Sequence, residues 1–156
     1  MSANSHQATP DGKLLPNTRM KIIITGGGGF LGSQLANKLL ERGIWCGQPI
    51  TEMVLLDAFF RGEPADARVK QIKGDIGDRA TVFAATGSKF DVIFHLASMV
   101  SGECEERFDD ALRVNLDGGR NVFEAAREAE GRPRVVFASS VACHGGIDMS
   151  QMMSDF

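Results

Sequence analysis

The 156-residue chain is 43% apolar and 24% charged, a composition typical of one globular domain that buries a core without disulfides or metal ions. Its 20 acidic and 17 basic side chains leave a formal net charge of −3, with Lys and Arg scattered singly, which excludes a nucleic-acid partner. Three widely spaced cysteines, and no apolar run near the about 18 residues of a membrane span, indicate a cytoplasmic protein with no metal site and no membrane partner.

The two ends of the chain show no pattern typical of helices or strands. Residues 1–19 are polar and contain two prolines and a glycine, so we expect a disordered tail there. Residues 147–156 contain three methionines without a clear period, and they receive no assignment. The folded domain is therefore expected over residues 20–146.

The first strand is expected at residues 20–25 (MKIIIT), and its apolar character indicates a central strand that is buried on both faces. A glycine run follows it and leads into a helix expected at residues 30–42, which Gly43 ends. The apolar stripe of this helix comprises Leu31, Leu35, Leu39 and Leu40.

Short apolar runs and helical stretches alternate along the rest of the chain. Asp78 is expected to cap a helix that runs through about residue 85. Four more strands are expected at residues 53–57, 69–73, 91–96 and 134–139. Strands that alternate with helices and right-handed crossovers predict an α/β fold with a doubly wound parallel sheet.

A long amphipathic helix is expected over residues 103–129, with a possible interruption near Gly118 and Gly119. Most of its buried face is expected to come from Phe108, Leu112, Leu116, Val122, Phe123 and Ala126.

Gly26, Gly29 and Gly32 recur at a spacing of three between the first strand and the first helix. In this context the first glycine allows a tight turn, the second lets the backbone approach a pyrophosphate, and the third lets helix and strand pack closely. A plain flexible turn is the alternative interpretation. The strand and helix on its two flanks favour a dinucleotide site.

Asp57 ends the expected second strand, where a carboxylate can accept hydrogen bonds from the adenosine ribose and repels a 2′-phosphate. It therefore favours NAD over NADP, although nearby Arg61 complicates this choice. Ordinary turn chemistry is the other interpretation of an aspartate at a strand end.

Further motifs follow the remaining strands, namely Gly74-Asp75-Ile76, His95-Leu96-Ala97-Ser98, Asn115-Leu116-Asp117-Gly118 and Ser139-Ser140. With the glycine spacing and Asp57, they resemble the N-terminal half of an extended short-chain dehydrogenase/reductase, a family that includes NAD-dependent sugar epimerases and dehydratases. The resemblance covers about residues 20–146. It implies a Rossmann-like sheet that is truncated after the fifth strand, with NAD as the cofactor.

The resemblance also implies roles for individual residues. Asp75 and Ile76 would hold the adenine, with the Asp75 carboxylate accepting from its amino group. Ser140 matches the family serine that hydrogen-bonds the substrate and assists proton transfer. Asn115 would face the sheet from the long helix as a structural or water-holding residue. The other positions matched to cofactor contact are Gly26, Gly29, Phe30, Leu31, Gly32, Leu96, Ala97 and Ser98.

Three positions depart from the family or invite another interpretation. His95 lies in an apolar strand, so a hydrogen-bonded core histidine is favoured over a catalytic base. Cys143 and His144 are adjacent in an extended segment and point to opposite faces, which argues against a nucleophile pair. His144 also stands where the family commonly has tyrosine.

The family's hydride transfer uses a Tyr-x-x-x-Lys pair, but this sequence contains no tyrosine and its last lysine is Lys89. We therefore expect the chain to be the NAD-binding portion of an oxidoreductase that acts on a secondary alcohol of a sugar acid. We expect these 156 residues to be catalytically inactive. A nucleotide-sugar epimerase or dehydratase fragment and a non-catalytic dinucleotide-binding module are the alternatives. In the family, the helix with Tyr and Lys packs beside the long helix and covers part of the sheet. We expect its loss to expose apolar surface and an open sheet edge, so that the chain is marginally stable and self-associates, with a homodimer through the long helix as one outcome.

Overall fold

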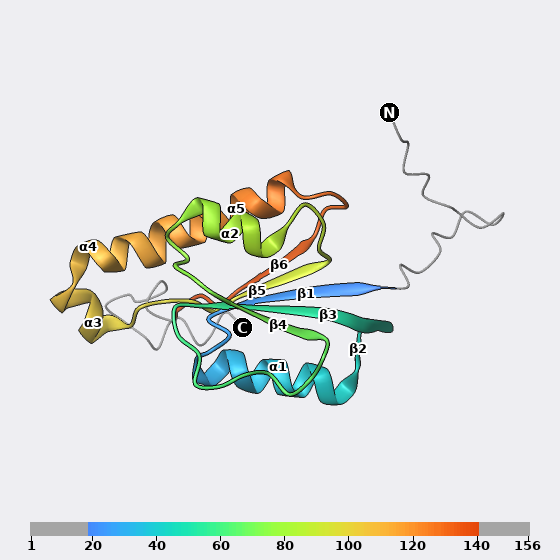
Figure 1. Cartoon of the computed structure of the whole chain (residues 1–156). Helices are drawn as coiled ribbons and strands as arrows, with labels where there is room; N and C mark the ends of the chain where they lie inside the picture. The colour runs from blue at the N-terminus through green and yellow to red at the C-terminus, as the bar shows by residue number, and fades with distance from the viewer. Residues whose placement is uncertain (1–18, 141–156) are drawn as a thin grey trace, which may run out of the picture.

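The computed structural model describes residues 19–140, which form a parallel sheet with helices on both faces. Figure 1 shows α1 on one side of the sheet and α2 and α5 on the other. The described residues leave out positions 1–18 of the tail expected at 1–19, the segment at 147–156, and Cys143 and His144.

The strands are β1 (Met20–Thr25), β2 (Ile44–Trp45), β3 (Gln48–Asp57), β4 (Val69–Lys73), β5 (Val92–His95) and β6 (Arg134–Phe137). The helices are α1 (Phe30–Arg42), α2 (Arg79–Thr86), α3 (Ser101–Glu106), α4 (Phe108–Ala111), the π-helix η1 (Leu112–Asp117) and α5 (Gly118–Glu128).

The sheet places β1 at its centre, between β3 and β5, and all three strands run parallel. Strand β4 adds to β3 on one side and β6 adds to β5 on the other, also in parallel. The chain thus winds outward from β1 in both directions, and the strand order reverses between β1 and β5. This arrangement confirms the doubly wound fold expected from the sequence, with its crevice at the carboxyl ends of the central strands.

Alternating residues of the central strands point into two separate hydrophobic cores, one on each face of the sheet. Ile23 of β1 packs with the side chains of α2 and α5, whereas Ile22 and Ile24 pack with those of α1. All three isoleucines are completely buried. The apolar run at residues 20–25 therefore makes β1 a strand covered on both faces, as expected.

Three expected elements match the structure closely. Strand β1, helix α1 and strand β4 have the expected bounds, and Gly43 ends α1 in the left-handed conformation with φ 65°. Asp78 caps α2 as expected, because its side chain accepts hydrogen bonds from the backbone N–H groups of Ala80 and Thr81.

Strand β3 begins five residues before the expected position, at Gln48 instead of Met53. The reason is a small hairpin, in which Trp45 of β2 pairs antiparallel with Gln48. Cys46 and Gly47 form its turn with φ values of 48° and 77°. The expected strands at 91–96 and 134–139 are shorter in the structure, which ends β5 at His95 and β6 at Phe137.

The expected long helix at residues 103–129 is divided differently from the prediction. The break falls at Arg107, with φ −132°, and the η1 segment adopts π-helical hydrogen bonding. Gly118, expected near an interruption, is helical with φ −59°. A π-helix places more residues in each turn than an α-helix, so side chains rotate relative to the expected apolar stripe.

The buried faces of two helices also differ from the predictions. Val122 is fully buried, but four other members of the expected stripe are exposed, namely Phe108, Leu112, Leu116 and Phe123. In α1, Leu39 is buried while Leu31, in the first turn, is 66% exposed. Of these exposed side chains, Phe123 lies beside Phe137 of β6, with ring centroids 6.0 Å apart, but half of its surface stays exposed. The periodic pattern alone therefore overestimated the burial of this set.

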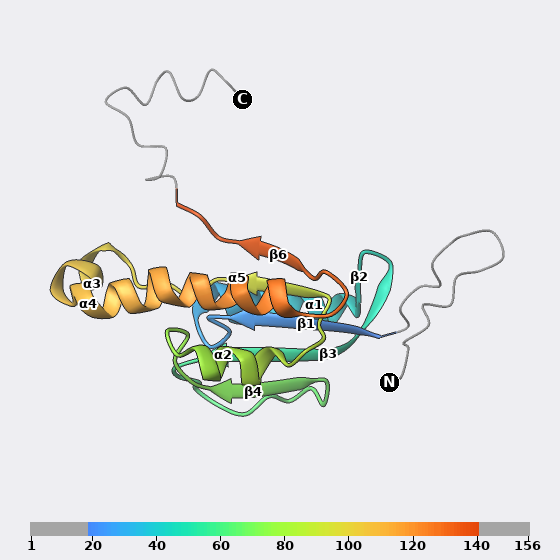
Figure 2. The ribbon, with the colours of Figure 1, turned by 90° about the horizontal axis from the view of Figure 1, so that it is seen from above.

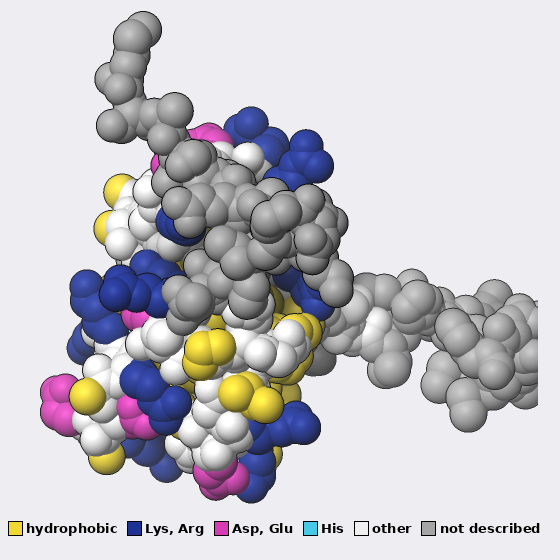
Figure 3. Space-filling view, turned by 90° about the vertical axis from the view of Figure 1, so that its right-hand side faces the viewer, with side chains coloured by type: hydrophobic (Ala, Val, Ile, Leu, Met, Phe, Trp, Pro, Cys, Tyr) yellow, Lys and Arg dark blue, Asp and Glu magenta, His cyan; other side chains and the backbone are white. Residues whose placement is uncertain are grey.

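Charge is spread over the molecular surface. Figure 3 views the face at the amino ends of the strands, where Lys and Arg side chains lie around the surface with Asp and Glu between them. In the described part of the chain, no helix is long and apolar enough to cross a membrane.

Candidate functional site

The glycine loop between β1 and α1 forms the centre of the candidate site. Gly26 has φ 71°, and a Cβ there would lie 2.8 Å from the backbone nitrogen of Ala97. A Cβ at Gly32 would lie 2.1 Å from the carbonyl oxygen of Gly26. Both positions therefore exclude any side chain, as the spacing predicted, because the loop is pressed between the start of α1 and the segment after β5.

The N-terminus of α1 faces this loop without a side-chain cap. Gly29 is the N-cap residue and makes no side-chain capping hydrogen bond, and the first turn contains no acidic residue. The first N–H groups of a helix have no partner within the helix, and the helix dipole concentrates positive charge there. This end of α1 can therefore receive an anion such as a pyrophosphate.

Asp57, at the end of β3, borders the loop on one side. Its carboxylate accepts hydrogen bonds from the backbone N–H groups of Gly28 at 2.9 Å and Phe59 at 3.1 Å. A carboxylate has about four lone-pair sites, so it can still accept from ligand hydroxyl groups. The structure thus places an acceptor beside the glycine loop.

Asp75 lies in the turn that follows β4. Its Oδ1 accepts from the backbone N–H of Gly77 at 2.8 Å, and its Oδ2 forms an ion pair with Arg113 of η1. Neighbouring Ile76 is buried, and its side chain packs in the core beneath the turn. The turn therefore presents a carboxylate above an apolar side chain.

His95 and Thr25 link the ends of β5 and β1 beneath the loop. The Thr25 hydroxyl lies 2.6 Å from Nδ1 of His95 and accepts from the backbone N–H groups of Leu96 and Ala97 at 3.3 Å. Burial lowers the pKa of His95 below its ordinary value. A neutral, hydrogen-bonded core histidine, as expected, holds the segment after β5 in place.

These segments enclose a pocket of about 390 Å³ at the carboxyl ends of β1, β3, β4 and β5. Eight residues matched to cofactor contact line it, namely Gly26, Gly29, Asp57, Asp75, Ile76, Leu96, Ala97 and Ser98. In Figure 1 this edge of the sheet faces the side on which α3 and α4 lie. The structure thus brings together most of the expected site from four separate loops.

Five expected site residues do not line this pocket. Phe30 and Leu31 are exposed in the first turn of α1, and Gly32 supports the loop from behind. The side chain of Asn115 bonds the backbone of Met99, at 2.8 Å to its nitrogen and 3.1 Å to its oxygen. Ser140 is exposed and follows β6.

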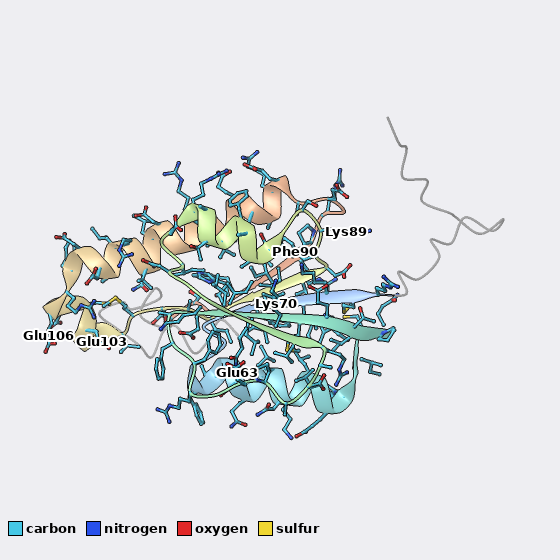
Figure 4. The ribbon with its side chains drawn as sticks, in the orientation of Figure 1. Glu63, Lys70, Lys89, Phe90, Glu103 and Glu106 are labelled. Carbon is cyan, nitrogen blue, oxygen red and sulfur yellow. The ribbon has the colours of Figure 1, made fainter. Side chains whose placement is uncertain are left out.

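The structure adds residues that the sequence did not single out. Gly28 and Val114 line the pocket, and Arg113 pairs with Asp75. Arg61, which the sequence already places near Asp57, lies in the wall between this pocket and a second one of about 380 Å³. The second pocket is bounded by α1 and the loop between β3 and β4. Figure 4 shows Glu63 on this loop, on the α1 side of the sheet. For Gly28, its position within the glycine run was a sequence feature that could have predicted its place in the pocket.

Comparison with known proteins gives a consistent result. The model of the NAD dependent epimerase/dehydratase family matches residues 22–152. D-erythronate dehydrogenase from Cupriavidus necator is 46% identical over 131 residues, which are 81% of this chain and 40% of that protein. The chain therefore spans less than half the length of this curated relative.

Two solved structures share the fold. The nucleoside-diphosphate-sugar epimerase from Agrobacterium tumefaciens has a TM-score of 0.72 and 36% identity, covering 88% of this chain and 42% of that chain. A uronate dehydrogenase variant from the same organism, complexed with NAD, has a TM-score of 0.64 and 30% identity. The match covers 78% of this chain and 41% of that chain.

Proposed function

The chain belongs to the NAD dependent epimerase/dehydratase family, and from this premise we propose that residues 20–146 are the NAD-binding domain of an oxidoreductase. The single observation that carries the proposal is the pocket at the carboxyl ends of the strands. It combines a glycine loop without room for side chains, an uncapped helix N-terminus and two carboxylates.

Each part of this pocket suits one part of NAD. The pyrophosphate would lie against the glycine loop and the N-terminus of α1, where N–H groups and the helix dipole favour an anion. Asp57 would accept from the adenosine ribose hydroxyls, and the turn at Asp75 and Ile76 would hold the adenine. When bound, NAD supplies a nicotinamide ring that takes up or releases a hydride.

We infer a preference for NAD over NADP from the position of Asp57. Its carboxylate accepts a hydrogen bond from the Gly28 N–H and so lies beside the glycine loop. A 2′-phosphate on the adenosine ribose would therefore meet a negative charge. Arg61 lies in the wall of the same pocket and would partly offset this repulsion.

For the substrate, we propose a sugar acid that resembles erythronate, which follows from the similarity to D-erythronate dehydrogenase. Ser140 follows β6 and matches the family serine, so it would hydrogen-bond the reacting hydroxyl of a secondary alcohol. Because the 156 residues contain no tyrosine, we expect this chain to bind the dinucleotide without turnover. A nucleotide-sugar epimerase or dehydratase is the second candidate, favoured by the TM-score of 0.72 with the Agrobacterium epimerase.

We also propose a cytoplasmic location and self-association through the long helical segment. The segment exposes Phe108, Leu116 and Phe123, with exposed fractions of 50% or more. Large exposed apolar side chains commonly mark an interaction surface.

The decisive experiment is a titration of the 156-residue chain with NADH, followed by its fluorescence and by calorimetry. We expect saturable binding, weaker binding of NADPH, and competition by ADP-ribose, which contains the groups that the pocket would hold. Asp57→Ala should weaken binding by about tenfold or more, because it removes a charged acceptor. Gly102→Ala is the control, since a Cβ there meets no atom within 4 Å.

A folded chain that shows no saturable NADH binding would contradict the proposal. To separate the two candidate substrates, the same titration is repeated in the presence of erythronate or of a nucleoside diphosphate sugar. Enhancement of NADH binding by erythronate supports the sugar-acid dehydrogenase, and enhancement by the nucleotide sugar supports the epimerase. Dinucleotide binding that neither compound affects supports a non-catalytic binding module.

A further inference from the structure

The turn that follows β4 is held by the helical segment η1–α5. Asn121, which is buried, donates from Nδ2 to the carbonyl oxygens of Ile76 and Gly77, each at 3.1 Å. A Cβ at Gly118 would lie 2.8 Å from the Ile76 side chain, so the helix backbone lies directly on the turn. The turn is therefore attached to a helix from a distant part of the chain.

Arg113 of η1 also holds the turn, through Asp75, which lines the pocket. Its guanidinium pairs with Oδ2 of Asp75 and also lies 3.3 Å from Oδ1 of Asp110. A Cβ at Gly77 would lie 2.6 Å from Cγ of Arg113. The Arg113 stem thus runs across Gly77, and its charged end meets Asp75 at the border of the pocket.

The Asp75 carboxylate is consequently held at both oxygens. The Gly77 N–H bonds Oδ1 at 2.8 Å, and Arg113 pairs with Oδ2. With these two partners the plane of the carboxylate is set, while lone pairs on both oxygens stay available for a further donor. Asp75 lines the pocket and Arg113 does not, so Arg113 acts on a ligand only through Asp75.

A carboxylate in this position distinguishes purine bases by one substituent. Adenine carries an amino group at C6, which donates a hydrogen bond to the carboxylate. A 6-oxo purine carries an acceptor at the same position, which faces the carboxylate without a proton between them. A site whose acceptor matches the 6-amino donor discriminates against the 6-oxo analogue, because two acceptors that face each other repel.

We propose that Arg113 is a specificity-determining positioning residue, which orients the Asp75 carboxylate so that the site selects a 6-amino over a 6-oxo purine dinucleotide. The inference rests on the proposed NAD-binding function and adds a residue outside the pocket to it. Arg113 itself does not touch the dinucleotide.

The test compares NADH with reduced nicotinamide hypoxanthine dinucleotide, in which a 6-oxo group replaces the 6-amino group and N1 carries a proton. Dissociation constants for both compounds are measured by fluorescence titration on the 156-residue chain. The unsubstituted chain should prefer NADH by about tenfold or more, as expected for a hydrogen bond to a charged group. Asp75→Asn, whose amide can also donate to a 6-oxo group, should abolish this preference.

Arg113→Gln should lower the preference by about threefold or more, because the carboxylate loses one of its two partners. Arg113→Lys, which keeps the cation, should restore part of it. Arg127→Gln is the matched control, since it removes an ion pair with Glu124 on α5 that does not involve Asp75, and it should leave the preference unchanged. Circular dichroism establishes that each variant is folded.

The outcomes separate the two proposals. If NADH binds but Arg113→Gln weakens both dinucleotides equally, Arg113 has only a structural role and the inference is overturned while the proposed function stands. An increased preference in Arg113→Gln also overturns it, since Arg113 would then compete with adenine for Asp75. Absence of NADH binding to the folded, unsubstituted chain overturns both.

Discussion

At the scale of single residues, the glycine loop is the part of the site with the least tolerance for change. Gly26, Gly28 and Gly32 lie where an added Cβ would come within 2.1–2.8 Å of backbone atoms. Backbone atoms cannot move aside as a flexible side chain can. A methyl group at one of these positions therefore has to displace the loop, the helix or the strand.

Gly32→Ala is expected to abolish NADH binding and to lower the melting temperature by about 5 °C or more, because its Cβ would lie 2.1 Å from the Gly26 carbonyl oxygen. Thermal unfolding by circular dichroism and NADH titration measure the two effects. Gly102→Ala, in open space, should change neither. Normal NADH affinity in Gly32→Ala would show that the loop relaxes freely.

His95 makes the stability of the domain dependent on pH. Burial lowers its pKa below the ordinary value of 6.5, so the folded chain binds fewer protons than the unfolded chain just below that pH. The free energy of unfolding should therefore be fully retained above pH 6.5. It should fall as pH decreases from 6.5 toward the folded pKa, by at most about 1.4 kcal/mol per pH unit.

Urea denaturation between pH 5 and 8 measures this dependence. His95→Gln removes the titrating ring and should flatten the curve in that range, at the cost of lower stability at pH 8. If the slope of the unsubstituted chain persists in the variant, another group is responsible for it.

At the scale of elements, the ends of helices were easier to predict than their buried faces. Asp78 and Gly43 act through bonds to residues a few positions away, so sequence alone identified the start of α2 and the end of α1. The segment from α3 to α5 was harder. It breaks at Arg107 and continues as a π-helix, whose Arg113 contacts the β4 turn and whose Asn115 contacts the loop after β5.

Asp78→Ala is expected to lower the melting temperature by about 3–6 °C, because the first turn of α2 loses acceptors for the N–H groups of Ala80 and Thr81. Asp78→Asn is the matched control, since asparagine caps helices about as well as aspartate. Equal melting temperatures for Asp78→Ala and Asp78→Asn would mean that the cap does not contribute.

At the scale of the whole molecule, the helical segment and the edge strand β6 expose a shared apolar surface. The rings of Phe123 and Phe137 lie 6.0 Å apart, each with half of its surface exposed. Figure 2 shows β6 at the edge of the sheet, beside α5. In the part of the chain that the structure describes, β6 pairs with β5 on one side and has no strand on the other.

We expect this surface to cause concentration-dependent self-association, measured by analytical ultracentrifugation. Leu116→Glu places a charge at an exposed position of the long helical segment and should weaken association by about tenfold or more. Ile44→Glu is the control, because Ile44 is similarly exposed, at 54%, but lies on β2. A monomer at all concentrations, or equal effects of the two substitutions, would contradict this role for the long helical segment.

The amino-acid sequence by itself determined the features that depend on neighbouring residues. Apolar runs produced the central strands, glycine spacing produced the loop before α1, and caps defined helix ends, because backbone conformation and local hydrogen bonds act over a few positions. The doubly wound order followed from the alternation of these elements.

Only the tertiary structure decided which distant residues meet. It paired Asp75 with Arg113, placed Asn121 beneath the same turn, and left Phe108 and Leu116 exposed. Periodicity predicts which residues share a helix face, but not whether another element covers that face. Contacts between residues 30 or more positions apart depend on how elements pack, so the wall around Asp75 could not be predicted from the sequence.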